Sequence, residues 1–126
     1  MTLPAESLSV RLARQAARLV LTSWWLAHVE ETAVLIVSEL VTNAVRHARG
    51  TDAIEVDLHA TGSWLRIEIH DTDPRWPRPR IPGECEESHF GFVLVDALAT
   101  AWGVRETAAG KAVWAELDIR AGDLSL

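Results

Sequence analysis

The sequence predicts an α+β fold in two layers, a mostly antiparallel sheet covered on one face by about three helices. Apolar residues recur at helical spacing up to about Ala48, and from Ala53 the period changes to two. The last third of the chain repeats the pattern of one helix followed by two alternating segments. Two helices, two strands, a loop, a helix and two strands suit a sheet with all its helices on one side.

The composition is that of one globular domain, which we assign to residues 1–126. Hydrophobic residues make up 48% of the chain and charged residues 24%, close to the average for soluble proteins. A chain of this length buries about two-thirds of its unfolded surface in a single core. We therefore expect neither a second domain nor extensive disorder.

The net charge argues against one class of partner, and the cysteine content and the absence of long apolar segments indicate where the protein works. A formal net charge of −6 repels a phosphate backbone, so no direct nucleic-acid binding is expected. Cys85 is the single cysteine, which excludes an internal disulfide, and no segment has the pattern of a membrane span or a signal peptide. We expect a cytoplasmic protein that binds no membrane.

The first predicted helix begins at Ser7 or Ser9, either of which can cap it, and runs to about Leu21. Its apolar residues are expected to face the core, with arginines opposite: the apolar set is Leu8, Leu12, Ala16, Leu19 and Val20, and the basic set is Arg11, Arg14 and Arg18. Trp24 and Trp25 follow the helix. A tryptophan pair at a helix end is usually a core or subunit contact, so a functional aromatic box is the less favoured interpretation.

The second predicted helix runs from about Val29 to Ala48 and stops at Gly50. Its core-facing stripe consists of Ala33, Val37, Leu40, Val41, Ala44 and Ala48. Glu39, Asn43 and His47 recur every fourth residue and share a second stripe at the rim of the core. This stripe is either a ligand-facing edge or the solvated side of an amphipathic helix.

A hairpin follows, in which Ile54, Val56 and Leu58 alternate with polar residues before a turn at residues 61–63. The next strand continues the alternation, and counting on by two places Asp71 on its buried side. A carboxylate that points to the core needs a hydrogen-bond donor. Either a ligand amine supplies it, or the strand has ended and Asp71 caps the following turn.

Residues 72–90 lose all periodicity and are predicted to form one long loop. Four prolines and three arginines fall within it: Pro74, Pro77, Pro79, Pro82, Arg75, Arg78 and Arg80. Long loops in compact domains are usually lids or binding segments, and these arginines suit phosphate or an acidic partner. A proline-rich ligand for an adaptor domain, and a zinc site at Cys85 and His89, are weaker alternatives.

The third predicted helix opens at Gly91 and runs to about Thr100, and a helix start beside an arginine-bearing loop suits an anion. A second hairpin then closes the domain, with strands over residues 102–107 and 112–119 joined at Ala108-Ala109-Gly110.

Glu39-x-x-x-Asn43-Ala44-x-x-His47 resembles the N-box of the Bergerat-fold (histidine-kinase-like) ATPases, the superfamily of gyrase, Hsp90, histidine kinases and MutL. The sequence of residues 38–48 is most similar to that of the anti-sigma-factor serine kinases, one branch of this superfamily. The resemblance continues through Asp71-Thr72-Asp73-Pro74, residues 91–99 and Trp102-Gly103-Val104, in the family's order and over nearly the whole chain.

The resemblance implies ATP and Mg²⁺ as cofactors and a role for each matched residue. Asn43 would ligate Mg²⁺, and Glu39 would be the general base that activates a substrate serine or water. Arg46 and His47 would face the phosphates, and Asp71 would accept the adenine amine. Asp73, Gly91 and Phe92 also fall in the nucleotide-binding motifs, and the amide groups near Gly91 would cradle phosphate oxygens.

Three departures from the family pattern remove expected contacts with the nucleotide. Asp73 and Arg75 stand where the first glycine motif has its glycines, and His89-Phe90-Gly91 lacks one glycine and an arginine of the second. Ala112 replaces a threonine that lies beside the adenine-binding aspartate. Each lost hydrogen bond is worth roughly 1 kcal/mol, so these changes weaken nucleotide binding.

Two functions therefore compete. The first is an ATP-dependent serine kinase that phosphorylates a small anti-anti-sigma protein and binds a sigma factor, with a homodimer suggested by the resemblance. The second is a catalytically weak or inactive protein-binding module with a degenerate nucleotide site. A third interpretation, the catalytic half of a histidine kinase, ranks last because the sequence shows neither dimerisation helices nor a phospho-acceptor histidine.

Overall fold

The computed structural model describes residues 1–47, 51–73 and 87–120, with the backbone alone for residues 87–91. Its helices are α1 (Leu8–Ser23), the short 3-10 helix η1 (Ala27–Val29), α2 (Glu30–His47) and α3 (Glu87–Leu98). Its strands are β1 (Thr2–Pro4), β2 (Ala53–Thr61), β3 (Trp64–Asp71), β4 (Ala101–Glu106) and β5 (Lys111–Asp118). In the described part of the chain, no helix is long and apolar enough to cross a membrane.

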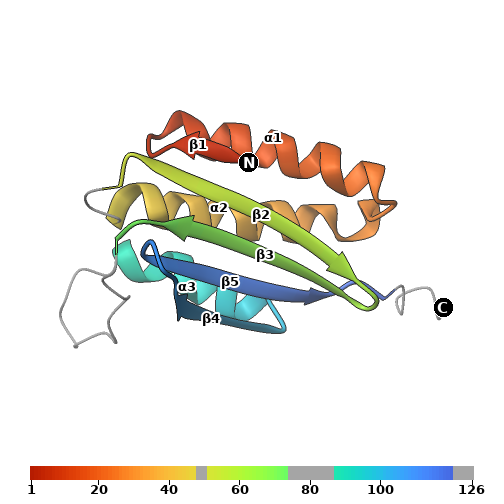
Figure 1. Ribbon diagram of the computed structural model, residues 1–126. Coiled ribbons are helices and arrows are strands. Elements are labelled where there is room, and N and C mark those ends of the chain that lie inside the picture. The colour runs from red at the N-terminus through yellow and green to blue at the C-terminus, as the bar shows by residue number, and fades with distance from the viewer. Residues whose placement is uncertain (48–50, 74–86, 121–126) are drawn as a thin grey trace.

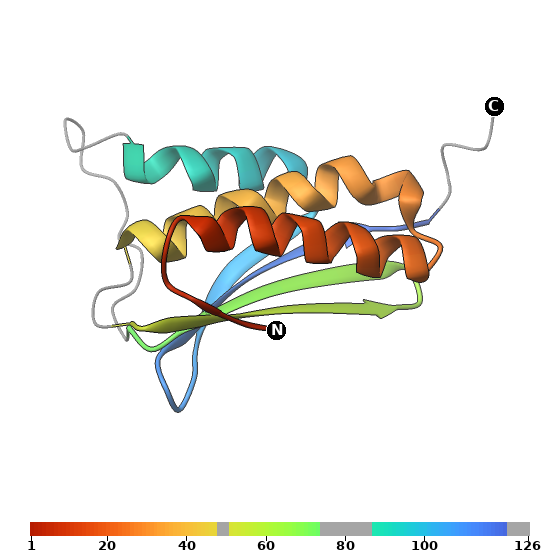
Figure 2. The same ribbon diagram turned by 90° about the horizontal axis from the view of Figure 1, so that it is seen from above.

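The five strands form one antiparallel sheet in the order β1-β2-β3-β5-β4. The three α-helices lie side by side against one face of this sheet, and no described helix covers the other face (Figure 2). This arrangement confirms the predicted α+β fold with a sheet covered on one side.

The core lies between the two layers, because α2 and the central strands each present an apolar face to the other. The α2 side chains of Ile36, Val37 and Val41 and the β3 side chains of Leu65 and Ile67 are fully buried. The predicted stripe of α2 is thus confirmed as far as Ala44, while Ala48 and Gly50 lie outside the described residues. The β2–β3 hairpin also follows the prediction, with Gly62 at a positive φ of 53° in its turn.

The prediction for the core face of α1 was wrong. Small residues face the core instead, namely Ser9, Ala13 and Ala17 together with Leu21. Leu8, Leu12 and Leu19 are 54%, 38% and 74% exposed. This helix carries apolar residues on two sides, so periodicity alone does not identify the core side, and the smaller side chains allow closer packing.

The caps and aromatic residues of α1 also differ from the prediction. Ser7 occupies the N-cap position without a side-chain cap hydrogen bond, and Ser9 lies inside the helix and donates to the carbonyl of Pro4. Trp24 is 39% exposed and Trp25 is 90% exposed with a φ of 61°. Neither tryptophan is therefore a buried core residue of this chain.

Two elements lie where the sequence did not place them. Strand β1 was not predicted, because a three-residue edge strand ending in proline has no readable period. Helix α3 begins at Glu87, so the prediction that it opens at Gly91 was wrong, and Gly91 lies within the helix. The prolines and arginines of residues 74–82, and Cys85, lie outside the described residues.

Candidate functional site

The candidate site residues gather where several elements end. The last turn of α2, the end of β3, the start of β5 and the start of α3 all lie at one end of the molecule (Figures 1 and 2). Thr51, just beyond α2, ties this end together: its Oγ1 lies 3.0 Å from Thr72 Oγ1 and accepts the Thr72 N–H at 3.1 Å. The segment just before β2 and the residue that follows β3 are thereby linked.

The polar stripe of α2 runs from a half-buried start to an exposed end. Glu39 and Asn43 are half-buried, whereas Arg46 and His47 are exposed. The amide nitrogen Nδ2 of Asn43 is buried and has no hydrogen-bond partner among the residues that the structure describes. A buried amide without an acceptor is costly, so this position suits a ligand that brings an acceptor, or, with the amide turned over, a cation.

Asp71 lies on the buried side of β3, as predicted, with its side chain 2% exposed. Its Oδ1 accepts the N–H of Asp73 at 2.8 Å, a contact typical of an aspartate that caps a turn. The same oxygen lies 3.0 Å from the Nζ of Lys111, directly across the strand ladder. Asp71 thus caps the following turn, as one alternative predicted, although it is still part of β3, and a further donor is the side chain of Lys111. A ligand amine at this carboxylate stays a prediction.

Lys111 is the residue that sequence reasoning missed. Its side chain is 8% exposed, and its Nζ donates to Asp71 Oδ1 and to the carbonyl of Asp73, both at 3.0 Å. It is the only lysine in the sequence, and a lone lysine at the start of an apolar strand was the signal that could have revealed it. A fully buried lysine is rare unless it is paired.

Gly110, in the turn between β4 and β5, lies against the end of β3. A Cβ atom at Gly110 would lie 2.3 Å from the carbonyl oxygen of Asp71 and 2.6 Å from the Cα of Thr72. Both atoms belong to the backbone, so neither can move aside without shifting the strand. The glycine therefore fixes Lys111 beside Asp71.

The remaining predicted site residues, Asp73, Gly91 and Phe92, differ in their surroundings. Asp73 is 3% exposed, and its carbonyl is held by Lys111. Phe92 is partly buried against the core and packs on Trp102, with the ring centroids 5.0 Å apart. Gly91 lies inside α3 rather than at its start. Of His89, the structure describes the backbone alone.

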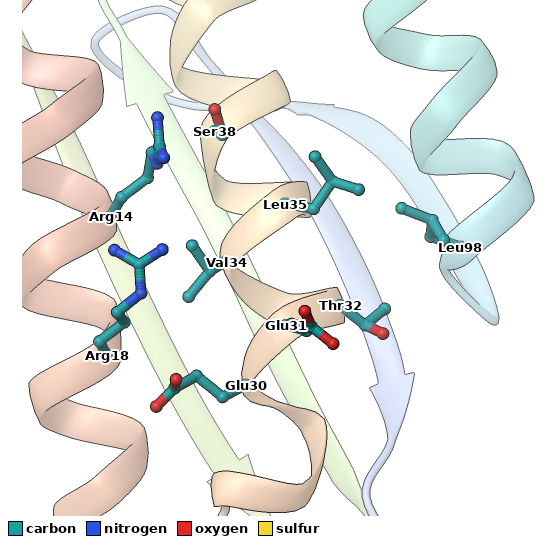
Figure 3. Close-up of a pocket in the computed structure, with 9 residues that line it drawn as sticks. All are labelled: Arg14, Arg18, Glu30, Glu31, Thr32, Val34, Leu35, Ser38 and Leu98. Carbon is teal, nitrogen blue, oxygen red and sulfur yellow. The ribbon is translucent and has the colours of Figure 1, made fainter.

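A groove of about 720 Å³ lies elsewhere, across the outer side of the helix layer. It is lined by Arg14, Arg18, Glu30, Glu31, Thr32, Val34, Leu35, Ser38 and Leu98. Figure 3 shows Arg18 extending from α1 toward Val34 of α2. Neither Asn43 nor Asp71 lines this groove, so it is distinct from the candidate site.

The open face of the sheet carries a separate charge network around Glu68, whose side chain is 9% exposed. Glu68 accepts from Arg66 and from Arg105, each at 2.6 Å, and lies 2.9 Å from His70 Nε2. Burial alone would raise the pKa of Glu68, but the hydrogen bonds from Arg66 and Arg105 hold it below its usual value. Burial would likewise lower the pKa of Arg66, which its bonds to Glu68 and Glu116 raise.

Close by, one group of described residues brings metal-ligating atoms together. Ligand atoms of Glu55, Asp57 and His70 lie within 4.8 Å of one another. His70 Nε2 is already 3.4 Å from Asp57 Oδ2 and pairs with Glu68. The group is therefore part of the charge network of this face.

Comparisons of the sequence with known proteins identify a family and one relative. A family model described as the histidine kinase-like ATPase domain matches residues 3–117. An uncharacterised protein of Streptomyces coelicolor is 34% identical over 84 residues, which are 63% of this chain and 78% of that protein.

Two solved structures share the fold. The RsbU and RsbW domains of Rv1364c from Mycobacterium tuberculosis match with a TM-score of 0.66 at 20% identity, over 94% of this chain and 32% of that chain. The blue-light activated histidine kinase of Erythrobacter litoralis EL346 matches with a TM-score of 0.51 at 22% identity, over 75% of this chain and 33% of that chain. The chain thus spans about a third of the solved chains it matches, and these likenesses show that it shares their fold.

Proposed function

The chain belongs to the histidine kinase-like ATPase family, and on that basis we propose that it is an ATP-binding regulatory protein of the anti-sigma serine kinase type. Its ligand is Mg²⁺-ATP, bound at the end of the molecule where α2, β3, β5 and α3 meet. Its proposed partners are a sigma factor and a small anti-anti-sigma protein that is phosphorylated on serine. A cytoplasmic homodimer is part of the same proposal.

The unpaired amide of Asn43 is the observation that best supports this function. A buried polar atom without a partner is rare in folded proteins, and Asn43 Nδ2 is such an atom among the described residues. A phosphate oxygen would accept from this nitrogen, and the amide oxygen is a suitable ligand for a hard cation. Bound Mg²⁺ would neutralise charge on the phosphates, which phosphoryl transfer requires.

The roles proposed for the other residues are those that the family resemblance implies. Glu39 lies one turn before Asn43 on the same side of α2 and is proposed as the general base toward the attacking hydroxyl. Arg46 and His47 are exposed at the end of α2 and are proposed to face the phosphates. Asp71 is proposed to lie at the base, with Asp73, Gly91 and Phe92 around the nucleotide.

A second candidate function is a protein-binding module without chemistry, and the pairing of Asp71 favours it. The carboxylate that would recognise adenine already has a buried ammonium partner. Ala112, fully buried beside it, offers no hydroxyl. The base end of the site is therefore satisfied without a ligand, in contrast to Asn43.

Titration calorimetry with Mg²⁺-ATP on the Asn43→Ala variant separates the two candidates. We expect the affinity to fall at least about tenfold, because the variant loses a cation ligand and a phosphate hydrogen bond. Thr42→Ala, one residue earlier on the same helix, is the matched control and should bind like the wild type. Equal binding by Asn43→Ala and wild type contradicts the proposed site, and no binding by a folded wild type favours the module.

Glu39→Gln tests the chemical step independently of binding. With labelled ATP, this variant should bind the nucleotide with unchanged affinity and lose turnover, since glutamine accepts no proton. Unchanged turnover in Glu39→Gln would remove Glu39 from the mechanism and leave the nucleotide site in place.

A further inference from the structure

Asp71 and Lys111 form an ion pair in which both side chains are buried. The two side chains are 2% and 8% exposed, and Lys111 Nζ lies 3.0 Å from Asp71 Oδ1. The ammonium also donates to the carbonyl of Asp73 at 3.0 Å, so it closes the turn that follows β3. The start of β5 lies close to this turn, because a Cβ atom at Gly110 would lie only 2.3 Å from the carbonyl oxygen of Asp71.

Removing one partner from a buried ion pair is strongly destabilising, because the other charge is left without compensation. Separating Lys111 from Asp71 to admit a ligand therefore costs free energy. A purine amine that reaches this carboxylate adds a hydrogen bond to a group that is already neutralised. The gain from such a bond is smaller than the gain from supplying the missing partner of a buried charge.

At Asn43, the other end of the proposed site, a ligand would supply a hydrogen-bond partner that is missing. Asn43 Nδ2 is buried and unpaired within the described part of the chain, so an acceptor brought by a ligand supplies a partner that the protein lacks. Binding energy is therefore expected from the phosphate and metal end, and little from the amino group of the base.

We propose that Lys111 takes the place of the purine amine at Asp71, so that this site binds nucleoside triphosphates through their phosphates with little selection for a 6-amino group. Lys111 is then a specificity-determining residue. This inference rests on the proposed nucleotide site and names the class of ligand that the site accepts.

The test compares ATP with purine riboside triphosphate, which lacks only the 6-amino group, both as magnesium complexes. For the wild type we expect affinities within about threefold of each other, because the amine meets a carboxylate that is already paired. For Lys111→Met we expect ATP to bind at least about tenfold more tightly than the analogue, because the amine becomes the partner of a charged acceptor. Magnesium tripolyphosphate, measured on both proteins, controls for the loss of one positive charge.

Arg66→Met is the matched control for lost stability. It removes a cation paired with Glu68 and Glu116 on the open face of the sheet, and its ratio of ATP to analogue affinity should equal that of the wild type. A ratio that rises in both variants overturns the proposal, since it would follow from destabilisation alone.

A spectroscopic measurement keeps the proposal testable if Lys111→Met does not fold. Because Lys111 is the only lysine, protein labelled with lysine that carries ¹³C at the ε carbon gives a single ε-carbon signal. We expect this signal to keep its position when Mg²⁺-ATP binds to the wild type. A shift to the position of a solvated lysine would show that the base displaces Lys111 and would overturn the proposal.

The two levels of inference fail differently. If the wild type binds ATP at least about tenfold more tightly than the analogue, the role of Lys111 is overturned and the nucleotide site stands. If neither the wild type nor Lys111→Met binds any of the three ligands, the proposed function is overturned and this inference with it.

Discussion

Two buried carboxylates on the same strand, Asp71 and Glu68, have different surroundings. Asp71 ends β3 on the core side and has one cationic partner, Lys111, among the residues that the structure describes. Glu68 lies on the open face and is shared by Arg66, Arg105 and His70. A carboxylate with several partners keeps its charge compensated when one is lost, whereas a carboxylate with one partner does not. The comparison suits a stabilising role for Glu68 in the sheet, and it is the basis of the proposal that Lys111 influences what binds at Asp71.

The largest difference is expected when one cation is removed from each region. Lys111→Met should lower the free energy of unfolding by about 3–5 kcal/mol, because Asp71 is left buried and unpaired. Arg105→Met should lower it by about 1 kcal/mol or less, because Arg105 is 48% exposed and Glu68 keeps two other partners. Urea denaturation measures both. Equal losses would show that the number of partners does not matter.

A smaller effect is expected from adding one methyl group beside each region. Gly110→Ala places a Cβ 2.3 Å from a backbone oxygen of Asp71, and we expect a loss of about 2–3 kcal/mol from overpacking. Gly103→Ala meets the ring of Trp114 at 2.8 Å, a side chain at the open face that can shift, so about 1 kcal/mol is expected. Thermal unfolding tests this order. A greater loss in Gly103→Ala would mean that the turn before β5 tolerates displacement.

The smallest effect is expected in acid. The pKa of Glu68 is lowered in the fold, chiefly by the hydrogen bonds from Arg66 and Arg105 that outweigh its burial. Its contribution to stability is therefore present above the ordinary glutamate value of 4.5 and is lost as the pH falls through the lowered pKa. Glu68→Gln should be less stable at pH 7 and lose less stability on acidification below that value. Parallel acid curves for the two proteins would exclude this role of Glu68.

The elements were predictable where one period dominates. The stripe of α2 and the alternation of the β2–β3 hairpin each place apolar residues on one side only, so burial follows from spacing. Helix α1 failed this test because leucines and small residues occupy opposite sides, and which side packs is decided by how closely the layers approach. The family resemblance located Asn43 and Asp71, but no local pattern revealed what pairs with them.

The amino-acid sequence by itself determined the order of the elements after β1, the core face of α2 and the buried side of Asp71, because each depends on spacing along the chain. The resemblance of its motifs pointed to the ATPase family. Only the tertiary structure decided the partners of the buried polar groups. Lys111 lies 40 positions from Asp71 and meets it because β5 pairs with β3. The amide nitrogen Nδ2 of Asn43 is left without a partner among the described residues. Hydrogen bonds between distant residues depend on strand pairing and on packing between layers, which local periodicity does not record.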